Sequence, residues 1–317
     1  MAYRQMTEII NAIRKKGRVG KNPYAAIDKD RLIQTLTQLE ELWPELKQHD
    51  SPTLENTTPS IYKNKRTDHA SKIPAFWSIF SSEALYRWAN NPQAKKIFQT
   101  VPAMPKFITI ELVDGLPIIL TYESGKLVNA AFINNGLYGK DITVQAMHLN
   151  AIPKTIKNTS NTVITARLTT YQSHYQSYND SRKDKNLPNI KTKAGVAAHI
   201  LENKDIADLA STKLLLIAYG IKTQSRSFST VEAELNYLRD TLDFTIPLRE
   251  TSCCAAEIDI TIRSIKQLSK PEAEGCRLLF NQIKAQLYTD QTANHPKYGV
   301  NYYFDSQPYD PNKIDLN

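Results

Sequence analysis

The stretch ELVDGLPIILTYESGKL, Glu111–Leu127, decides the fold of this chain. Together with the residues on either side, it repeats apolar positions with a period of two, which is typical of β-strands. The pairs Asp114–Gly115 and Ser124–Gly125 interrupt this alternation, and such pairs favour tight hairpin turns. The pattern therefore predicts an antiparallel meander, with strands over 107–112, 116–123 and 127–133.

The rest of the chain adds helices and further strands to this meander. Apolar residues at a spacing of three and four predict amphipathic helices, and apolar runs next to glycine predict buried strands. The predicted helices span 3–16, 28–46, 205–210, 232–241 and 272–287, and the further strands span 162–171 and 213–221. This mixture predicts an α+β fold with antiparallel sheet at its centre.

The chain divides by composition into three parts. Residues 1–50 form a small helical subdomain, residues 51–72 are poor in apolar side chains and form a linker, and residues 73–317 form the main domain. No apolar run approaches the ~18 residues of a membrane span, so no membrane partner is expected. The N-terminus lacks the apolar core of a signal peptide.

Charge and cysteine content indicate which partners, compartment and metal sites to expect. The 317 residues carry a net charge of +8, which suits a polyanionic partner or simply a basic globular protein. Three cysteines make neither a disulfide framework nor a metal-ligand pattern, and the six histidines are scattered. We therefore expect a cytoplasmic protein without a metal site.

Four motifs occur in an order that matches a known family. They are LEELWPELKQHDSPT (39–53), HASKIPAFWSIFSSEAL (69–85), the segment 111–156 from ELVDG to IPKTI, and LLLIAYG (214–220). The chain resembles the adenylation region of bacterial NAD-dependent DNA ligases over almost its whole length. The resemblance implies a nucleotidyltransferase fold with antiparallel sheets, preceded by a small helical subdomain, and a nucleotide pocket between two sheet-containing halves.

The chain departs from the family where the chemistry takes place. The lysine of the family's KxDG motif attacks the α-phosphate of NAD, and here that position holds Leu112, which has no lone pair. Ile133 stands at the arginine of the RGDG turn, and Arg167 at the glutamate that binds the nucleotide sugar. Ile190 stands near the arginine of the NPRN segment, with Lys191 beside it. No catalytic residue is therefore expected.

The resemblance nevertheless implies residues that line the old pocket. Ser78 and Ile79 correspond to the family's Ser-Leu on the adenine side. The full set of candidates is Ser78, Ile79, Leu112, Asp114, Gly115, Ile133, Arg167 and Lys191. A buried cation needs a partner, so we expect Arg167 to pair with Asp114 when no ligand is bound. With a phosphate-bearing ligand, Arg167 would instead make a bidentate contact.

Three further assignments have two candidates each. The family's late DGVVIK strand matches either 257–264 or, preferably, 297–304. The tyrosine-rich segment 169–182 suits stacking on single-stranded nucleic acid, or, as we prefer, a helix that packs its tyrosines inward. Lys106 and Lys126 are candidate substitute nucleophiles, but Lys106 precedes a strand and Lys126 follows a turn, and both positions favour solvated side chains.

These observations predict a catalytically inactive relative of the family, a pseudo-ligase with a binding or regulatory role. The alternative is an active nucleotidyltransferase, or an enzyme that handles NAD or another nucleotide, which acts on nucleic acid or protein with relocated catalytic residues. In the family's N-terminal D-x-E-Y-D cluster, Lys29 replaces the tyrosine and only Asp30 is kept, which argues against NAD as a substrate. No cofactor is expected, and NAD or AMP would bind weakly. The partner is open between a nucleotide, a nucleic acid and a protein.

Overall fold

The computed structural model describes the central part of the chain. The described residues are 66–68, 76–79, 82–90, 98–99, 106–133, 138–203, 205–269, 273–287 and 298–304. The chain divides into one unit of Met1–Ile61 with Tyr309–Asn317 and a second unit, Tyr62–Pro308, which holds every described residue. The predicted helices over 3–16 and 28–46, the subdomain 1–50 and most of the linker 51–72 lie outside the described residues.

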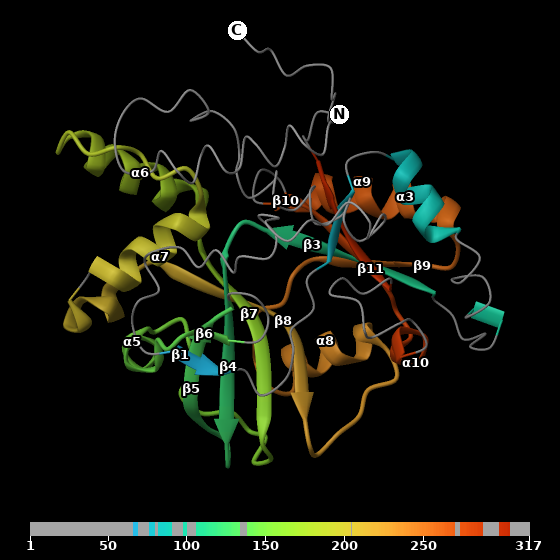
Figure 1. The fold of residues 1–317 in the computed structure, drawn as a ribbon, viewed down its shortest axis with the longest axis horizontal. Helices are drawn as coiled ribbons and strands as arrows, with labels where there is room; N and C mark the ends of the chain where they lie inside the picture. The colour runs from blue at the N-terminus through green and yellow to red at the C-terminus, as the bar shows by residue number, and fades with distance from the viewer. Residues whose placement is uncertain are drawn as a thin grey trace, which may run out of the picture. The chain divides into compact units, whose positions relative to one another are not determined.

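A four-stranded antiparallel sheet forms one half of the second unit (Figure 1). Its strands, in spatial order, are β5 Lys126–Phe132, β4 Leu116–Glu123, β7 Thr162–Thr170 and β8 Leu214–Thr223. The predicted turn between β4 and β5 is confirmed, because Ser124 and Gly125 have φ of 49° and 76°. Positive φ at both central residues is what a tight hairpin with the twist of its strands requires.

A five-stranded sheet forms the other half. In spatial order it holds β2 Trp77–Ile79, β11 Gly299–Tyr303, β10 Ala273–Phe280, β3 Phe107–Val113 and β9 Arg249–Ser252. All neighbours are antiparallel except β11 and β2, which run parallel. A separate ribbon pairs β1 Arg66–Asp68 with β6 Tyr138–Lys140. The predicted α+β class with antiparallel sheets is confirmed.

The predicted meander is wrong at its first turn. β3 and β4 lie in different sheets, so Asp114–Gly115 carries the chain from one sheet to the other instead of closing a hairpin. The Asp114 carbonyl accepts a hydrogen bond from Thr169 Oγ1 at 2.6 Å, on β7. A Cβ on Gly115 would lie 3.1 Å from the Arg167 Cβ, so the crossing backbone approaches β7 closely. Contacts distant in sequence thus override the local turn signal.

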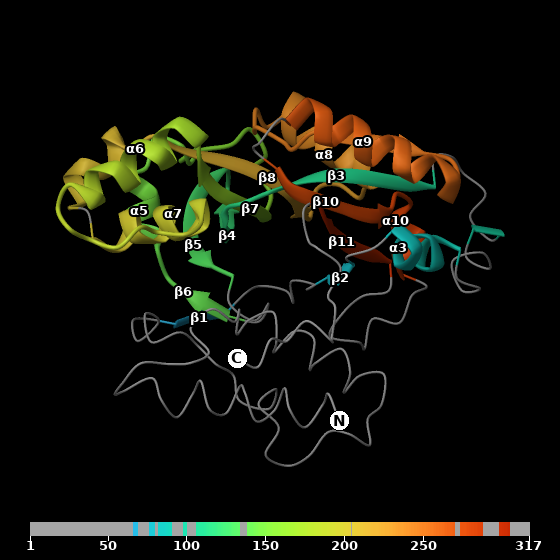
Figure 2. The same ribbon diagram turned by 90° about the horizontal axis from the view of Figure 1, so that it is seen from above.

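Helices cover both sheets (Figure 2). α7 packs on β4 and β7, α8 on β8, and α9 on β3, β9 and β10. The α-helices are α3 Ser82–Ala89, α5 Thr143–His148, α6 Gln172–Lys183, α7 Lys193–Asn203, α8 Val231–Asp240, α9 Ile258–Ser269 and α10 Ile283–Leu287. Two 3-10 helices, η3 Ile206–Ser211 and η4 Ala255–Glu257, complete the set that the structure describes.

The predicted helix over 272–287 is wrong. Its first half is β10, which pairs with β3 on one side and β11 on the other, and only the short α10 that follows is helical. The candidate strand over 257–264 is also wrong, because these residues end η4 and begin α9. In the first segment, the two neighbouring strands decide the conformation more strongly than local propensity does, whereas the second segment packs as a helix on β3, β9 and β10.

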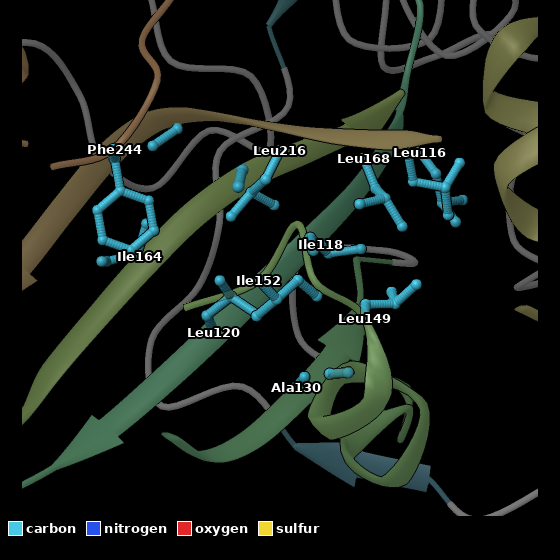
Figure 3. Close-up of a cluster of buried hydrophobic side chains, with 14 of the residues drawn as sticks. Leu116, Ile118, Leu120, Ala130, Leu149, Ile152, Ile164, Leu168, Leu216 and Phe244 are labelled. Atoms are coloured by element: carbon cyan, nitrogen blue, oxygen red, sulfur yellow. The ribbon is translucent and has the colours of Figure 1, made fainter. Parts of the chain in front are cut away.

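Two hydrophobic cores hold the unit together. The larger one packs the inward residues of β4, β5, β7 and β8 against α5, α7 and α8, and Figure 3 shows the part around Leu120, Ile152 and Phe244. The second lies between α3, α9 and the five-stranded sheet, where Phe98, Phe107 and Phe280 make edge-to-face ring contacts. Each such fully buried side chain contributes about 1.5–3 kcal/mol.

Candidate functional site

Leu112 lies inside the molecule at the end of β3. Its side chain is 0% exposed, and its backbone lies opposite Gly275 on β10. A Cβ on Gly275 would lie 2.2 Å from the Tyr302 carbonyl oxygen of β11, so the three strands are closely packed here. A leucine has neither a proton to give nor a lone pair to attack with, so this position carries no nucleophile.

Asp114 is bound to the N-terminus of α7. Its Oδ2 accepts from the Lys193 N–H at 2.6 Å, and its Oδ1 accepts from the Ala194 N–H at 3.2 Å. Free N–H groups and the helix dipole both favour a carboxylate at this end of a helix. The expected pair between Asp114 and Arg167 is therefore wrong, because the helix already satisfies both carboxylate oxygens.

Arg167 is paired with Glu274 instead. From β7, its Nη1 donates to Glu274 Oε1 at 3.2 Å and to the Val113 carbonyl at 2.5 Å. Burial raises the pKa of the Glu274 carboxyl, and the Arg167 charge opposes that shift. The two side chains are 19% and 36% exposed, so solvent reaches the pair.

Tyr219 joins the two sheets. A β-bulge in the pairing of β8 with β7 leaves this residue without a strand partner, and bulges of this kind re-aim a side chain. Its hydroxyl accepts from the Val113 N–H at 3.0 Å and donates to the Glu111 carbonyl at 2.9 Å. Burial raises the pKa of Tyr219 to about 12, so the phenol keeps its proton near neutral pH.

Arg277 on β10 is a residue of this site that the sequence analysis missed. Its guanidinium lies 4.7 Å from the centre of the Phe76 ring and 5.9 Å from that of Tyr219, and its Nε donates to Asn301 Oδ1 at 3.0 Å. Burial and the nearby charge of Arg167 lower the pKa of Arg277 to about 10, so it is a cation at neutral pH.

A signal for this strand was present in the sequence. Glu274–Gly275, followed by Cys-Arg-Leu-Leu, fits the acidic–glycine start of the DGVVIK pattern better than 257–264 or 297–304 does. The preferred candidate 297–304 does contain a strand, β11, but it holds no acidic–glycine pair. We therefore interpret β10 as the counterpart of that pattern, which places Leu279 at its lysine.

The remaining candidates from the sequence lie on other elements than Arg167 and Arg277. Ser78 and Ile79 form part of β2, and Ser78 hydrogen-bonds the side chain of Tyr303 next to Glu274. Ile133 follows β5 and donates its N–H to the Pro117 carbonyl, and Pro117 lies opposite Arg167 in the pairing of β4 with β7. Lys191 is exposed, two residues before the α7 N–H groups that hold Asp114.

The tyrosine-rich segment forms α6, as preferred. Tyr175 donates to the Ile190 carbonyl at 2.9 Å, and the Tyr178 hydroxyl lies 2.8 Å from His199 Nδ1. Tyr171, at the N-cap, is 56% exposed, so the expectation that it packs inward is wrong.

In the part of the chain that the structure describes, no group of histidine, cysteine and acidic residues could hold a metal ion. No described helix is long and apolar enough to cross a membrane.

Comparisons with known proteins give the same family as the motifs. The family model for the NAD-dependent DNA ligase adenylation domain matches residues 63–307. A DNA ligase of Corynebacterium aurimucosum is 24% identical over 94% of this chain, and one of Caldicellulosiruptor saccharolyticus is 23% identical over 99%. The chain spans only 45% and 46% of these two relatives. The ATP-dependent DNA ligase of bacteriophage T7, solved with ATP, has a TM-score of 0.34 and 10% identity, covering 66% of this chain and 63% of that one.

Proposed function

Because the chain belongs to the NAD-dependent DNA ligase adenylation-domain family, we propose that it is a member that does not adenylate and serves a binding or regulatory role. The observation that carries this proposal is Leu112. A lysyl-AMP intermediate needs an amine at the point of attack, and covalent catalysis cannot proceed without its nucleophile. Leu112 is fully buried, so it also fills the space where that amine would lie.

The neighbours of Leu112 support the same proposal. In the family resemblance, the position of Arg167 belongs to a glutamate that binds the nucleotide sugar. In this chain the position is a cation, and it is paired with Glu274. The guanidinium of Arg277 lies over the rings of Phe76 and Tyr219, so those ring faces are not free to stack a planar base. We therefore expect NAD and ATP to bind more weakly than about 1 mM, the level of ~4 kcal/mol.

The test is a search for the covalent intermediate. The full chain is incubated with NAD and, separately, with ATP and Mg²⁺, and its intact mass is measured. No gain of one AMP is expected. A gain of one AMP on the wild-type chain would overturn the proposal, and its loss in Lys106→Ala or Lys126→Ala would then identify a relocated nucleophile. A matched reaction with an active member of the family shows that the conditions support adenylation.

A nucleic acid is the first partner to test. The curated relatives are named DNA ligases, and the net charge of +8 favours a polyanion. Binding to nicked and intact DNA duplexes is measured by fluorescence anisotropy at several salt concentrations. A specific role predicts tighter binding to the nicked duplex at every salt concentration, whereas equal binding that weakens steeply with salt indicates charge attraction alone.

A further inference from the structure

Two arginines share one aromatic ring beside the position of Leu112. The guanidinium carbons of Arg167 and Arg277 each lie 5.9 Å from the centre of the Tyr219 ring, one reaching it from β7 and the other from β10. Arg167 forms an ion pair with Glu274. Among the described residues, Arg277 forms no ion pair with a carboxylate, and its hydrogen bond goes to the neutral amide of Asn301.

The other carboxylates near the two arginines are already engaged. Asp114 accepts from two N–H groups of α7, and Glu111 Oε2 accepts from the Leu248 N–H at 3.0 Å. Two cations therefore share one carboxylate, Glu274. Cation–π contacts with two rings offset part of the cost of burying a guanidinium, but they supply no negative charge.

We propose that Arg167 and Arg277 form a binding site for a small oxyanion of the phosphate class, either free phosphate or the phosphate of a monoester. The proposal rests on the proposed function, because it gives the site a ligand other than the nucleotide of an adenylating enzyme. Two guanidinium groups offer paired N–H donors that match a tetrahedral dianion bidentately. In the family resemblance a glutamate that binds the nucleotide sugar stands at Arg167, and an apolar residue of the DGVVIK pattern stands at Arg277, so the pair of arginines is not part of the resemblance.

The contacts of Arg277 argue against a nucleotide as the carrier. Its guanidinium lies over the ring of Phe76 at 4.7 Å and over that of Tyr219 at 5.9 Å, so these two ring faces beside Arg167 are not free to stack a base. A small ion can approach Arg167 from solvent, because the side chains of Arg167 and Glu274 are 19% and 36% exposed.

Glu274 competes with the anion for Arg167. Arg167, Arg277, Asp114 and Tyr303 are the charged or titratable groups that act on it or respond to it. Burial raises the pKa of Glu274, and Asp114 raises it further against the effect of the arginines. Protonation would release Arg167 for the anion, so binding should tighten as the pH falls.

The test is calorimetric titration of the full chain with phosphate and with sulfate at constant ionic strength. Sulfate keeps its charge between pH 6 and 8, so its pH dependence reports on the protein. We expect binding to weaken at least about tenfold in Arg167→Gln and Arg277→Gln, the loss of a bidentate charge-assisted contact. Arg263→Gln, which removes the same charge from the exposed face of α9, should leave binding unchanged.

Glu274→Gln gives an independent result that does not depend on the arginine variants folding. It keeps an acceptor for Arg167 and removes the competing charge, so sulfate should bind more tightly at pH 8, and the dependence on pH should disappear. Unchanged affinity in both Arg277→Gln and Glu274→Gln would overturn the proposal and leave an adventitious ion only.

Two further ligands separate this proposal from the proposed function. Ribose 5-phosphate should bind at least as tightly as phosphate. AMP should bind no more than about threefold more tightly than ribose 5-phosphate, which is far below the gain in affinity that a stacked base gives. A gain of about a hundredfold for AMP would overturn the oxyanion proposal even if no covalent adduct forms. Conversely, an AMP adduct together with arginine-dependent phosphate binding would overturn the proposed function alone.

Discussion

Glu234 offers a quantitative test of the packing between α8 and β8. Its Oε1 accepts from the Ile221 N–H at 2.5 Å, on the edge of β8 that pairs with no strand among the described residues. Burial raises the pKa of Glu234 to about 7, and the backbone hydrogen bond and Lys222 oppose this shift. The substitution Glu234→Gln keeps an oxygen that can accept from Ile221 and removes the ionisable group.

The sign of the effect follows from proton binding in the two states. Between pH 4.5 and about 7, Glu234 is ionised in the unfolded chain and protonated in the folded one. The folded state then binds more protons, so the free energy of unfolding falls as the pH rises through this window. A shift from 4.5 to about 7 corresponds to a loss of about 3 kcal/mol, at 1.36 kcal/mol for each pKa unit.

The assay is urea unfolding of the wild-type chain and Glu234→Gln at pH 4.5, 6, 7 and 8. The variant should differ little from the wild type at pH 4.5 and should be more stable by about 2–3 kcal/mol at pH 8. Taking the difference between the two chains cancels the other titrating groups. Glu232→Gln makes the same change on the same helix and serves as the control. A difference that stays constant from pH 4.5 to 8 would refute the reasoning.

Three further substitutions test the site itself. Leu112→Lys places an unpaired ammonium at a fully buried position, so unfolding should become easier by about 3–5 kcal/mol, and mass spectrometry should still detect no AMP adduct. Asp114→Ala removes the acceptor of the Lys193 and Ala194 N–H groups and should lower the free energy of unfolding in urea by about 1–2 kcal/mol. Asp114→Asn keeps an acceptor oxygen and should lose only a small part of this stability. Gly275→Ala forces a Cβ to within 2.2 Å of a carbonyl oxygen, so circular dichroism should show a melting temperature lower by at least about 5 °C.

The local part of the fold could be predicted from the sequence. The strand over 116–123 was predicted with the bounds of β4, and the turn at Ser124–Gly125 was predicted from its residues alone. Both follow from alternation and turn chemistry within a few residues. Asp114–Gly115 carries the same kind of signal, but its carboxylate binds N–H groups 79 and 80 positions further on, which no local pattern reveals.

In the candidate site, too, only part of the arrangement could be predicted from the sequence. The absence of an amine at Leu112 could be inferred from the family resemblance, whereas the partner of Arg167 could not. Asp114 was the nearer carboxylate in the expected geometry, but Glu274, 107 positions away, reaches Arg167 because β10 pairs with β3. Arg277 could not be placed for a related reason, because the spacing of residues 272–287 predicts a helix, and only pairing with β3 and β11 makes residues 273–280 a central strand.

The Tyr219 hydroxyl has a mechanical consequence. β9 pairs with β3 only as far as Ile110. Beyond that point the Glu111 N–H donates to the Leu248 carbonyl, while the Tyr219 hydroxyl binds the Glu111 carbonyl and the Val113 N–H. One side chain of the four-stranded sheet thus links it to the five-stranded sheet, and sliding one sheet along the other would break two hydrogen bonds of about 1 kcal/mol each. Any movement of one sheet along the other at this point therefore requires the Tyr219 hydroxyl to give up or exchange both of its backbone partners.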